Sequence, residues 1–296
     1  MAHPEIFYKY TQASTALIVL RTGRLRWSSP LLFDDPAEFK RMPCFEPSIA
    51  EAAKTFPATI VHAAIGQFPV KEQVLAKNAR LLLTMTRLMI KRGMSPTDVI
   101  VELGEIPEVS DDKFETRLLE FFNNKFISTA RVVCISISFD NDALWENYAE
   151  SFKGCVIGFR HIPKLSTPFL AARKVTYSEH QPVVGSGTDF LLYGDTDQLR
   201  RSTIDAVCFT KKHHWAYQQE WRAVTWRDEE GEAKFGDYKF YPEELESVTL
   251  GLSATADTES AVANLLREMY PNCRLYRLVQ ENGISKRVLV NLDVGA

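Results

Sequence analysis

The spacing of apolar residues changes along this chain, and that change limits the folds it can adopt. Across Glu38–Arg131, apolar residues recur every three to four positions, which predicts amphipathic helices. The clearest cases are Ile49–Phe56, Glu72–Lys91 and Lys113–Phe126. After this segment, short runs rich in β-branched residues begin with Val132–Ser138 and predict strands. Because helices separate only some of these strands, the pattern indicates an α+β fold rather than strict strand–helix alternation.

Short strands are expected on both sides of the helical segment. Before it, Ile6–Tyr10 and Arg24–Ser28 flank a helix that ends before Gly23. The strands expected after it are Cys155–Phe159, Lys174–Tyr177, Val207–Phe209, Glu220–Trp226, Val248–Gly251, Arg274–Leu278 and Val288–Leu292. The helices expected there are Ala143–Ser151, Asp197–Ala206 and Asp257–Tyr270, the last capped by Asp257 or Thr258. Ser178–Asp195 is expected to be a loop and Asp228–Gly231 a turn.

The length of 296 residues is compatible with one large domain or two small ones. We interpret residues 1–296 as a single α+β domain, in which residues 38–131 form a mostly helical insertion or lid. The alternative for that segment is a purely structural role beside the strands.

Charge and cysteine usage exclude several classes of protein. The formal net charge is −3, from 35 basic and 38 acidic residues, which disfavours a general nucleic-acid binder. No apolar run approaches the ~20 residues of a membrane span, and no signal peptide is visible, so we expect no membrane partner. The five cysteines are far apart and form no CxxC pair, which predicts reduced thiols, a cytoplasmic location and no metal.

The densest group of functional side chains lies in Lys211–Arg222. If this stretch is extended, Gln218 and Glu220 share one face and Trp221 faces the core. A carboxylate beside an amide can bind a sugar hydroxyl and stabilise nearby positive charge. The alternative is that Glu220 forms a structural ion pair with Arg222 or another arginine. For the adjacent His213 and His214, an exposed or hydrogen-bonded role is favoured over metal binding, because no third ligand lies nearby.

Two further groups could contact a ligand. On the helix near residue 145, Trp145 and Tyr148 are three positions apart and share a face, so they could frame a planar group. The alternative is that both belong to the core. At the N-terminus, Lys9 lies between two tyrosines and Arg24–Ser28 ends in hydroxyls, an arrangement that could hold a phosphate or a ribose. A solvated strand edge explains those residues equally well.

Three of these segments together resemble a large bacterial domain family of unknown function. The matching residues are Tyr8-Lys9-Tyr10, Leu25–Pro30, Asp34-Asp35-Pro36, Leu144-Trp145, Tyr148-Ala149, Lys153-Gly154, Lys211 or Lys212, Trp215, Tyr217 and Glu220-Trp221-Arg222. The chain departs from the family at Gln218, where the family usually has Glu, and at Asp34, where it usually has Asn.

The same layout is similar to the ADP-ribosyltransferase superfamily. That resemblance implies a split β core with a helical insertion, NAD as cofactor, and Gln218 and Glu220 as the catalytic pair. It implies that Glu220 binds the ribose and stabilises an oxocarbenium-like state, while Gln218 orients the acceptor nucleophile. The residues it implies for cofactor binding are Tyr8, Lys9, Tyr10, Ser28, Ser29, Trp145, Tyr148 and Arg222. No Arg or His stands on the first strand, where these enzymes place one.

Two functions therefore remain open. The first is an ADP-ribosyltransferase-like enzyme that transfers ADP-ribose to a macromolecular acceptor, as a toxin or defence protein does. The second is a catalytically inactive module of the same fold that binds a nucleotide-type small molecule or a protein. An unrelated nuclease or hydrolase is a third, less specific alternative.

Overall fold

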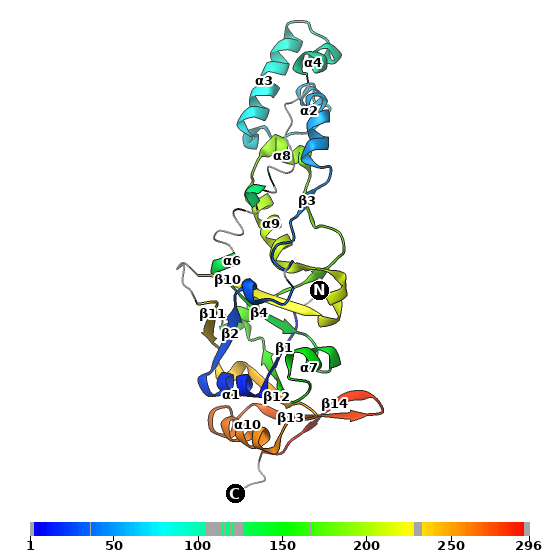
Figure 1. Cartoon of the computed structure of the whole chain (residues 1–296). Helices are drawn as coiled ribbons and strands as arrows, with labels where there is room; N and C mark the ends of the chain where they lie inside the picture. The colour runs from blue at the N-terminus through cyan, green and yellow to red at the C-terminus, as the bar shows by residue number, and fades with distance from the viewer. Residues whose placement is uncertain are drawn as a thin grey trace. The chain divides into compact units, whose positions relative to one another are not determined.

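The computed structural model describes residues 3–35, 37–104, 114, 116–118, 120, 127–165, 167–227 and 233–292. The chain divides into two compact units. The first, here the sheet unit, comprises Met1–Pro36, Phe126–Tyr177 and Lys211–Ala296, and the second, here the helical unit, comprises Ala37–Lys125 and Ser178–Thr210. The fold is mixed α+β, as the sequence predicts (Figure 1).

The sheet unit contains a 10-stranded mixed sheet. Its strands are β1 (Ile6–Thr11), β2 (Arg24–Ser28), β4 (Ala130–Ser136), β5 (Cys155–Arg160), β6 (Arg173–Lys174), β10 (Glu220–Trp226), β11 (Phe235–Lys239), β12 (Leu245–Leu250), β13 (Arg274–Glu281) and β14 (Ile284–Leu289). They follow the order β11-β2-β4-β1-β5-β12-β13-β14, and β10 pairs with β4 and β6. β12 and β13 pair in parallel, whereas β10 and β4 pair antiparallel.

The sheet divides at β4. One edge of β4 pairs with β10 along its whole length, from Glu220 opposite Ser136 to Trp226 opposite Ala130. The other edge is shared, because β1 pairs with it at Ser136 and β2 pairs with it at Val132. Strands β1 and β2 therefore meet β4 at different points along its length.

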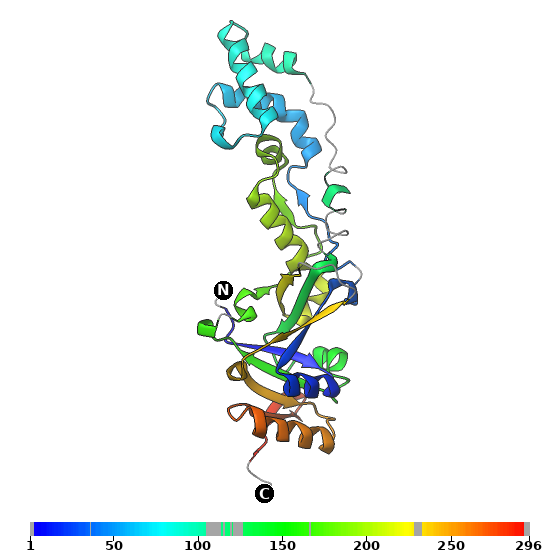
Figure 2. The ribbon, with the colours of Figure 1, turned by 90° about the vertical axis from the view of Figure 1, so that its left-hand side faces the viewer.

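The two faces of the sheet have separate cores. Successive strand residues point to opposite faces, so Phe7 packs in one core while Tyr8 and Tyr10 pack in the other. The first core includes helices α1 (Ala13–Thr22) and α10 (Ala256–Met269), which lie side by side (Figure 2). The second core includes α7 (Asp142–Tyr148), which contacts β1. The candidate site residues of β10 belong to this second face.

The helical unit has a core of its own. Among the described residues its helices include α2 (Ile49–Ala64), α3 (Lys77–Lys91), α4 (Pro96–Leu103), α8 (Gly187–Tyr193) and α9 (Asp197–Phe209), and strands β3 (Cys44–Phe45) and β8 (Val183–Gly185) pair in parallel. Apolar side chains of α2, α3 and α8 form one cluster, which includes Phe56, Leu83 and Leu192. Ser48 and Glu51 form a reciprocal capping box that fixes the start of α2.

Several expected elements differ from those observed. Val207–Phe209 is the last turn of α9 rather than a strand, and all three residues are buried there. The expected loop Ser178–Asp195 contains β8 and α8. Glu72–Lys91 is a 3₁₀ turn, Glu72–Val74, followed by α3, and Thr255 caps α10. The turn expected at Asp228–Gly231, and all but five residues of the helix expected at Lys113–Phe126, lie outside the described residues.

No helix in the described part of the chain is long and apolar enough to cross a membrane.

Candidate functional site

The candidate site begins with the register between β10 and β4. Glu220 lies opposite Ser136, and Arg222 lies opposite Cys134. Because directly paired residues of an antiparallel ladder project to the same face, these four side chains form one patch. Trp221 projects to the other face and packs in the first core, as the sequence predicts.

A bend at Gln219 brings Gln218 and Glu220 onto the same partner. The condition of an extended stretch is met only from Glu220 onward, because His213–Gln218 forms a 3₁₀ helix and Gln219 adopts left-handed φ and ψ angles of 45° and 45°. That conformation costs a non-glycine residue roughly 1–2 kcal/mol, so the surrounding contacts must hold it. The Lys211 ammonium donates to Gln218 Oε1 at 2.9 Å and to Glu220 Oε2 at 3.2 Å. One buried cation therefore joins the predicted pair.

The carboxylate of Glu220 is held by two cations. Arg222 donates to both of its oxygens, with Nη2 at 3.0 Å from Oε2, and Lys211 adds the contact already described. Glu220 is 5% exposed and Arg222 is fully buried. The structural ion pair left open by the sequence is thus present. Such buried charges are tolerated only when every partner is in place, so the three side chains act as a unit.

Burial and charge shift the pKa values of the groups around Glu220. Burial, the largest single effect, would lower the pKa of Lys211, but the charge and hydrogen bond of Glu220, together with contributions from Cys134 and Tyr148, outweigh it, and the Lys211 pKa is raised. Burial lowers the pKa of the Arg222 guanidinium, and the charge of Asp35 opposes that change. Burial, reinforced by the charge of Glu220, raises the pKa of the Cys134 thiol well above its usual value. Cys134 is therefore a neutral thiol rather than a nucleophile at neutral pH.

Aromatic side chains surround the buried charges. Gln218 Nε2 donates to the Tyr148 hydroxyl at 2.9 Å, and the Glu220 backbone N–H donates to the Tyr177 hydroxyl at 2.8 Å. The Lys211 ammonium lies 4.9 Å from the centre of the Trp215 ring. Burial raises the pKa of Tyr148 to about 12, so its hydroxyl remains protonated and able to donate a hydrogen bond.

The structure adds Asp35, which the sequence placed in the family resemblance but not among the site residues. Trp215 Nε1 donates to Asp35 Oδ2 at 3.1 Å, and the charge of Asp35 acts on Arg222. The only sequence signal that linked Asp35 to Trp215 was the family resemblance, because both residues belong to motifs that match the same family. Sequence spacing could not predict a contact between these two residues, because they are 180 positions apart.

Three predicted cofactor-binding residues lie in the second core. Tyr8 and Tyr10 are 7% and 6% exposed, and Trp145 is fully buried. The Tyr10 hydroxyl donates to the Ser138 carbonyl at 2.9 Å, and Trp145 Nε1 donates to the Phe139 carbonyl at 2.8 Å. These contacts fix the loop that leads into α7 and leave the Trp145 ring no exposed face. Of the Trp145–Tyr148 pair, the structure exposes only Tyr148.

Lys9 and the two serines complete the predicted set. Lys9 Nζ donates to the Cys134 carbonyl at 3.0 Å, which places it beside the patch. Ser28 pairs with Val132, four residues along β4 from Ser136, or about 13 Å at the usual rise per residue. Ser29 is 1% exposed, and its hydroxyl bonds the Ile127 carbonyl and the Leu31 N–H. The structure therefore does not bring the serines to Glu220.

The described residues contain no cluster of metal-ligating side chains. No group of three or more His, Cys, Asp or Glu side chains there could hold a metal ion. His213 and His214 are exposed at the start of the 3₁₀ helix, and His214 contacts the Trp215 ring, with 5.1 Å between ring centres.

No family model, curated protein or solved structure matches this chain.

Proposed function

We propose that the sheet unit is a non-catalytic module that binds a nucleotide-type ligand over Tyr148 and Tyr217. The observation that carries this proposal is the contrast between the buried, ion-paired side chains of the site and its exposed tyrosines. Glu220 is buried and bonded to Lys211 and Arg222, while Tyr148 and Tyr217 are each 36% exposed, and Gln218 links Tyr148 to Lys211.

The ion pairs disfavour catalysis by Glu220. Cleavage of a nicotinamide–ribose bond develops positive charge on the ribose, and a catalytic carboxylate must lie against that charge. Glu220 already pairs with two cations, which together outweigh its single negative charge, so a third positive charge would gain little from it. The carboxylate is also too buried to bond a ribose hydroxyl without displacing Lys211 or Arg222.

The exposed side chains of the site suit nucleotide binding better than Glu220 suits catalysis. Tyrosine rings with exposed faces can stack on a base, at about 1–3 kcal/mol per base in single-stranded complexes. Tyr217 directly precedes Gln218 in the chain, and the Gln218 side-chain amide donates to the Tyr148 hydroxyl. Lys212, exposed at the start of the same 3₁₀ helix, supplies a cation for a phosphate.

NAD-dependent transfer of ADP-ribose to a macromolecule is the second candidate. It is favoured by one observation, the convergence of Gln218 and Glu220 on Lys211 beside Tyr148. The candidate requires a ligand that displaces at least one cation from Glu220.

Calorimetric titration of the full chain with AMP, ADP-ribose and NAD tests the proposal. We expect binding of at least one nucleotide, and an affinity about tenfold weaker in Tyr148→Leu, because the stacking face is lost. Tyr148→Phe is the matched control and should bind as the wild type does, since it keeps the ring. The absence of binding by all three nucleotides would refute a nucleotide module.

A second measurement separates the two candidates. Incubation with NAD should release no nicotinamide, in the wild type or in Glu220→Gln. Release by the wild type that disappears in Glu220→Gln would replace the binding module with the transferase.

A further inference from the structure

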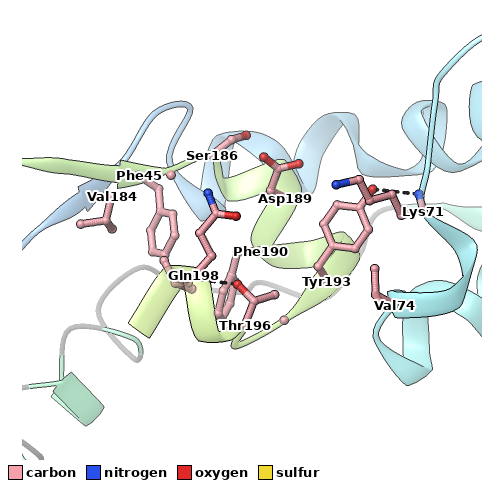
Figure 3. Close-up of a pocket in the computed structure, with 13 residues that line it drawn as sticks. Phe45, Lys71, Val74, Val184, Ser186, Asp189, Phe190, Tyr193, Thr196 and Gln198 are labelled. Atoms are coloured by element: carbon pink, nitrogen blue, oxygen red, sulfur yellow. Dashed lines mark hydrogen bonds between the residues drawn. The ribbon is translucent and has the colours of Figure 1, made fainter. Parts of the chain in front are cut away.

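The helical unit contains a cavity of about 390 Å³, within the size range of small-molecule sites. Its lining comes from β3, β8, α8, the start of α9 and the turn that precedes α3 (Figure 3). All of these elements belong to the helical unit, so the cavity is separate from the Glu220 site.

Aromatic rings form the apolar part of the cavity. Phe45 and Phe190 contact each other with 5.4 Å between ring centres, and Tyr193 lies one turn of α8 beyond Phe190. The Tyr193 hydroxyl accepts a hydrogen bond from the Lys71 backbone N–H at 3.2 Å, which fixes its ring (Figure 3). A ligand in this cavity would therefore meet ring faces and edges that are already held in place.

Three polar side chains at the cavity have no partner among the described residues. The Ser186 and Thr196 hydroxyls cap α8 and α9, so their bonding is accounted for. By contrast, no hydrogen bond or ion pair within the described ranges engages the Asp189 carboxylate, the Lys71 ammonium or the Gln198 amide. In Figure 3 the Lys71 side chain extends over Tyr193 toward Asp189, and Gln198 lies on the other side of Asp189. The cavity therefore offers one anion and one cation beside an aromatic surface.

We propose that this cavity binds a free α-amino acid with an aromatic or large apolar side chain. The ammonium group would pair with Asp189, the carboxylate with Lys71, and the side chain would pack against Phe190 and Phe45. A zwitterion matches both charges, because its two ionised groups sit on one carbon atom and meet opposite partners. A nucleotide matches less well, because Asp189 between Gln198 and Lys71 would repel its phosphates.

Titration of the full chain with L-phenylalanine, followed by calorimetry, tests this inference. We expect saturable binding that weakens about tenfold or more in Asp189→Asn and in Lys71→Gln, since each removes a charge-assisted hydrogen bond. The matched controls are Glu102→Gln and Lys40→Gln, exposed residues of the same unit outside the cavity lining, which should leave the affinity unchanged.

Ligand analogues complete the test. Phenylalaninamide lacks the carboxylate and hydrocinnamate lacks the ammonium, so both should bind about tenfold or more weakly than phenylalanine. Equal binding of phenylalanine and phenylalaninamide would assign the cavity to a peptide N-terminus and overturn the proposed role of Lys71. Absence of phenylalanine binding would overturn the inference altogether. Neither result depends on whether the sheet unit binds a nucleotide.

Discussion

Lys211 is the residue that joins the two halves of the candidate site, because its ammonium bonds both Gln218 and Glu220. We expect Lys211→Met to lower the free energy of unfolding of the sheet unit by about 2–4 kcal/mol, since it leaves buried acceptors unpaired. Urea denaturation followed by tryptophan fluorescence measures this. The neighbouring Lys212 is exposed, so Lys212→Met should change stability by less than about 0.5 kcal/mol. Equal effects of the two substitutions would contradict the importance of the buried network.

Buried thiols make stability depend on alkaline pH. Burial raises the pKa values of Cys155 and Cys273 to about 12, from an ordinary value of 9.0. Above pH 9 the unfolded chain loses these protons while the folded chain keeps them, so the free energy of unfolding falls as pH rises from 9 toward 12. Urea denaturation between pH 8 and 10.5 should show this decline, and the double variant Cys155→Ala, Cys273→Ala should show a shallower one. Identical slopes would indicate that other groups dominate.

At the candidate site, the sequence identified residues better than it identified their roles. Lys211, Gln218, Glu220 and Arg222 were found because they are dense in one segment, and they do converge. Their arrangement was not predictable, since it depends on the left-handed bend at Gln219, which no residue type signals. The three-residue spacing of Trp145 and Tyr148 could not show whether Trp145 lines a ligand site or belongs to the core. Either role places the two rings on one face of the helix.

Among the elements, α8 depends on one close approach. A Cβ atom at Gly187 would lie 2.4 Å from the Ser48 backbone oxygen, and the Gly187 N–H donates to Pro47 O at 2.8 Å. We expect Gly187→Ala to destabilise the helical unit by about 1–3 kcal/mol, because backbone must move to admit the methyl group. Circular dichroism during urea denaturation measures the change.

Gly185 provides a matched control for this substitution. The atom nearest to a Cβ there is in the Phe45 ring at 4.0 Å, so Gly185→Ala should be close to neutral. A large loss of stability in Gly185→Ala, or none in Gly187→Ala, would contradict this account of how α8 packs.

Element type was predictable where local pattern and burial agree. β4 and β5 are runs of β-branched and aromatic residues, and both are strands. Val207–Phe209 has a similar composition but continues α9, where Val207 lies on the buried face of Thr203 and Ala206 and the final turn is buried as a whole. The hairpin of β13 and β14 turns at Asn282-Gly283, a dipeptide that favours positive φ and marks such turns.

At the scale of the whole molecule, burial is concentrated in separate cores. The sheet unit has its two clusters on opposite faces of the sheet, with Ile157 fully buried in the larger one. The helical unit has the cluster around Leu83, which is 2% exposed. Each unit therefore has the apolar interior that independent folding requires.

This division predicts two unfolding transitions, which different probes can resolve. All five tryptophans lie in the sheet unit, so their fluorescence reports on that unit, whereas circular dichroism at helical wavelengths also follows α2, α3 and α9. Truncation of a buried aliphatic side chain costs about 2–5 kcal/mol. We expect Leu83→Ala to lower the dichroism midpoint in urea while leaving the fluorescence midpoint unchanged. Ile157→Ala should lower the fluorescence midpoint. If each variant moves both midpoints equally, the two units unfold as one cooperative domain instead.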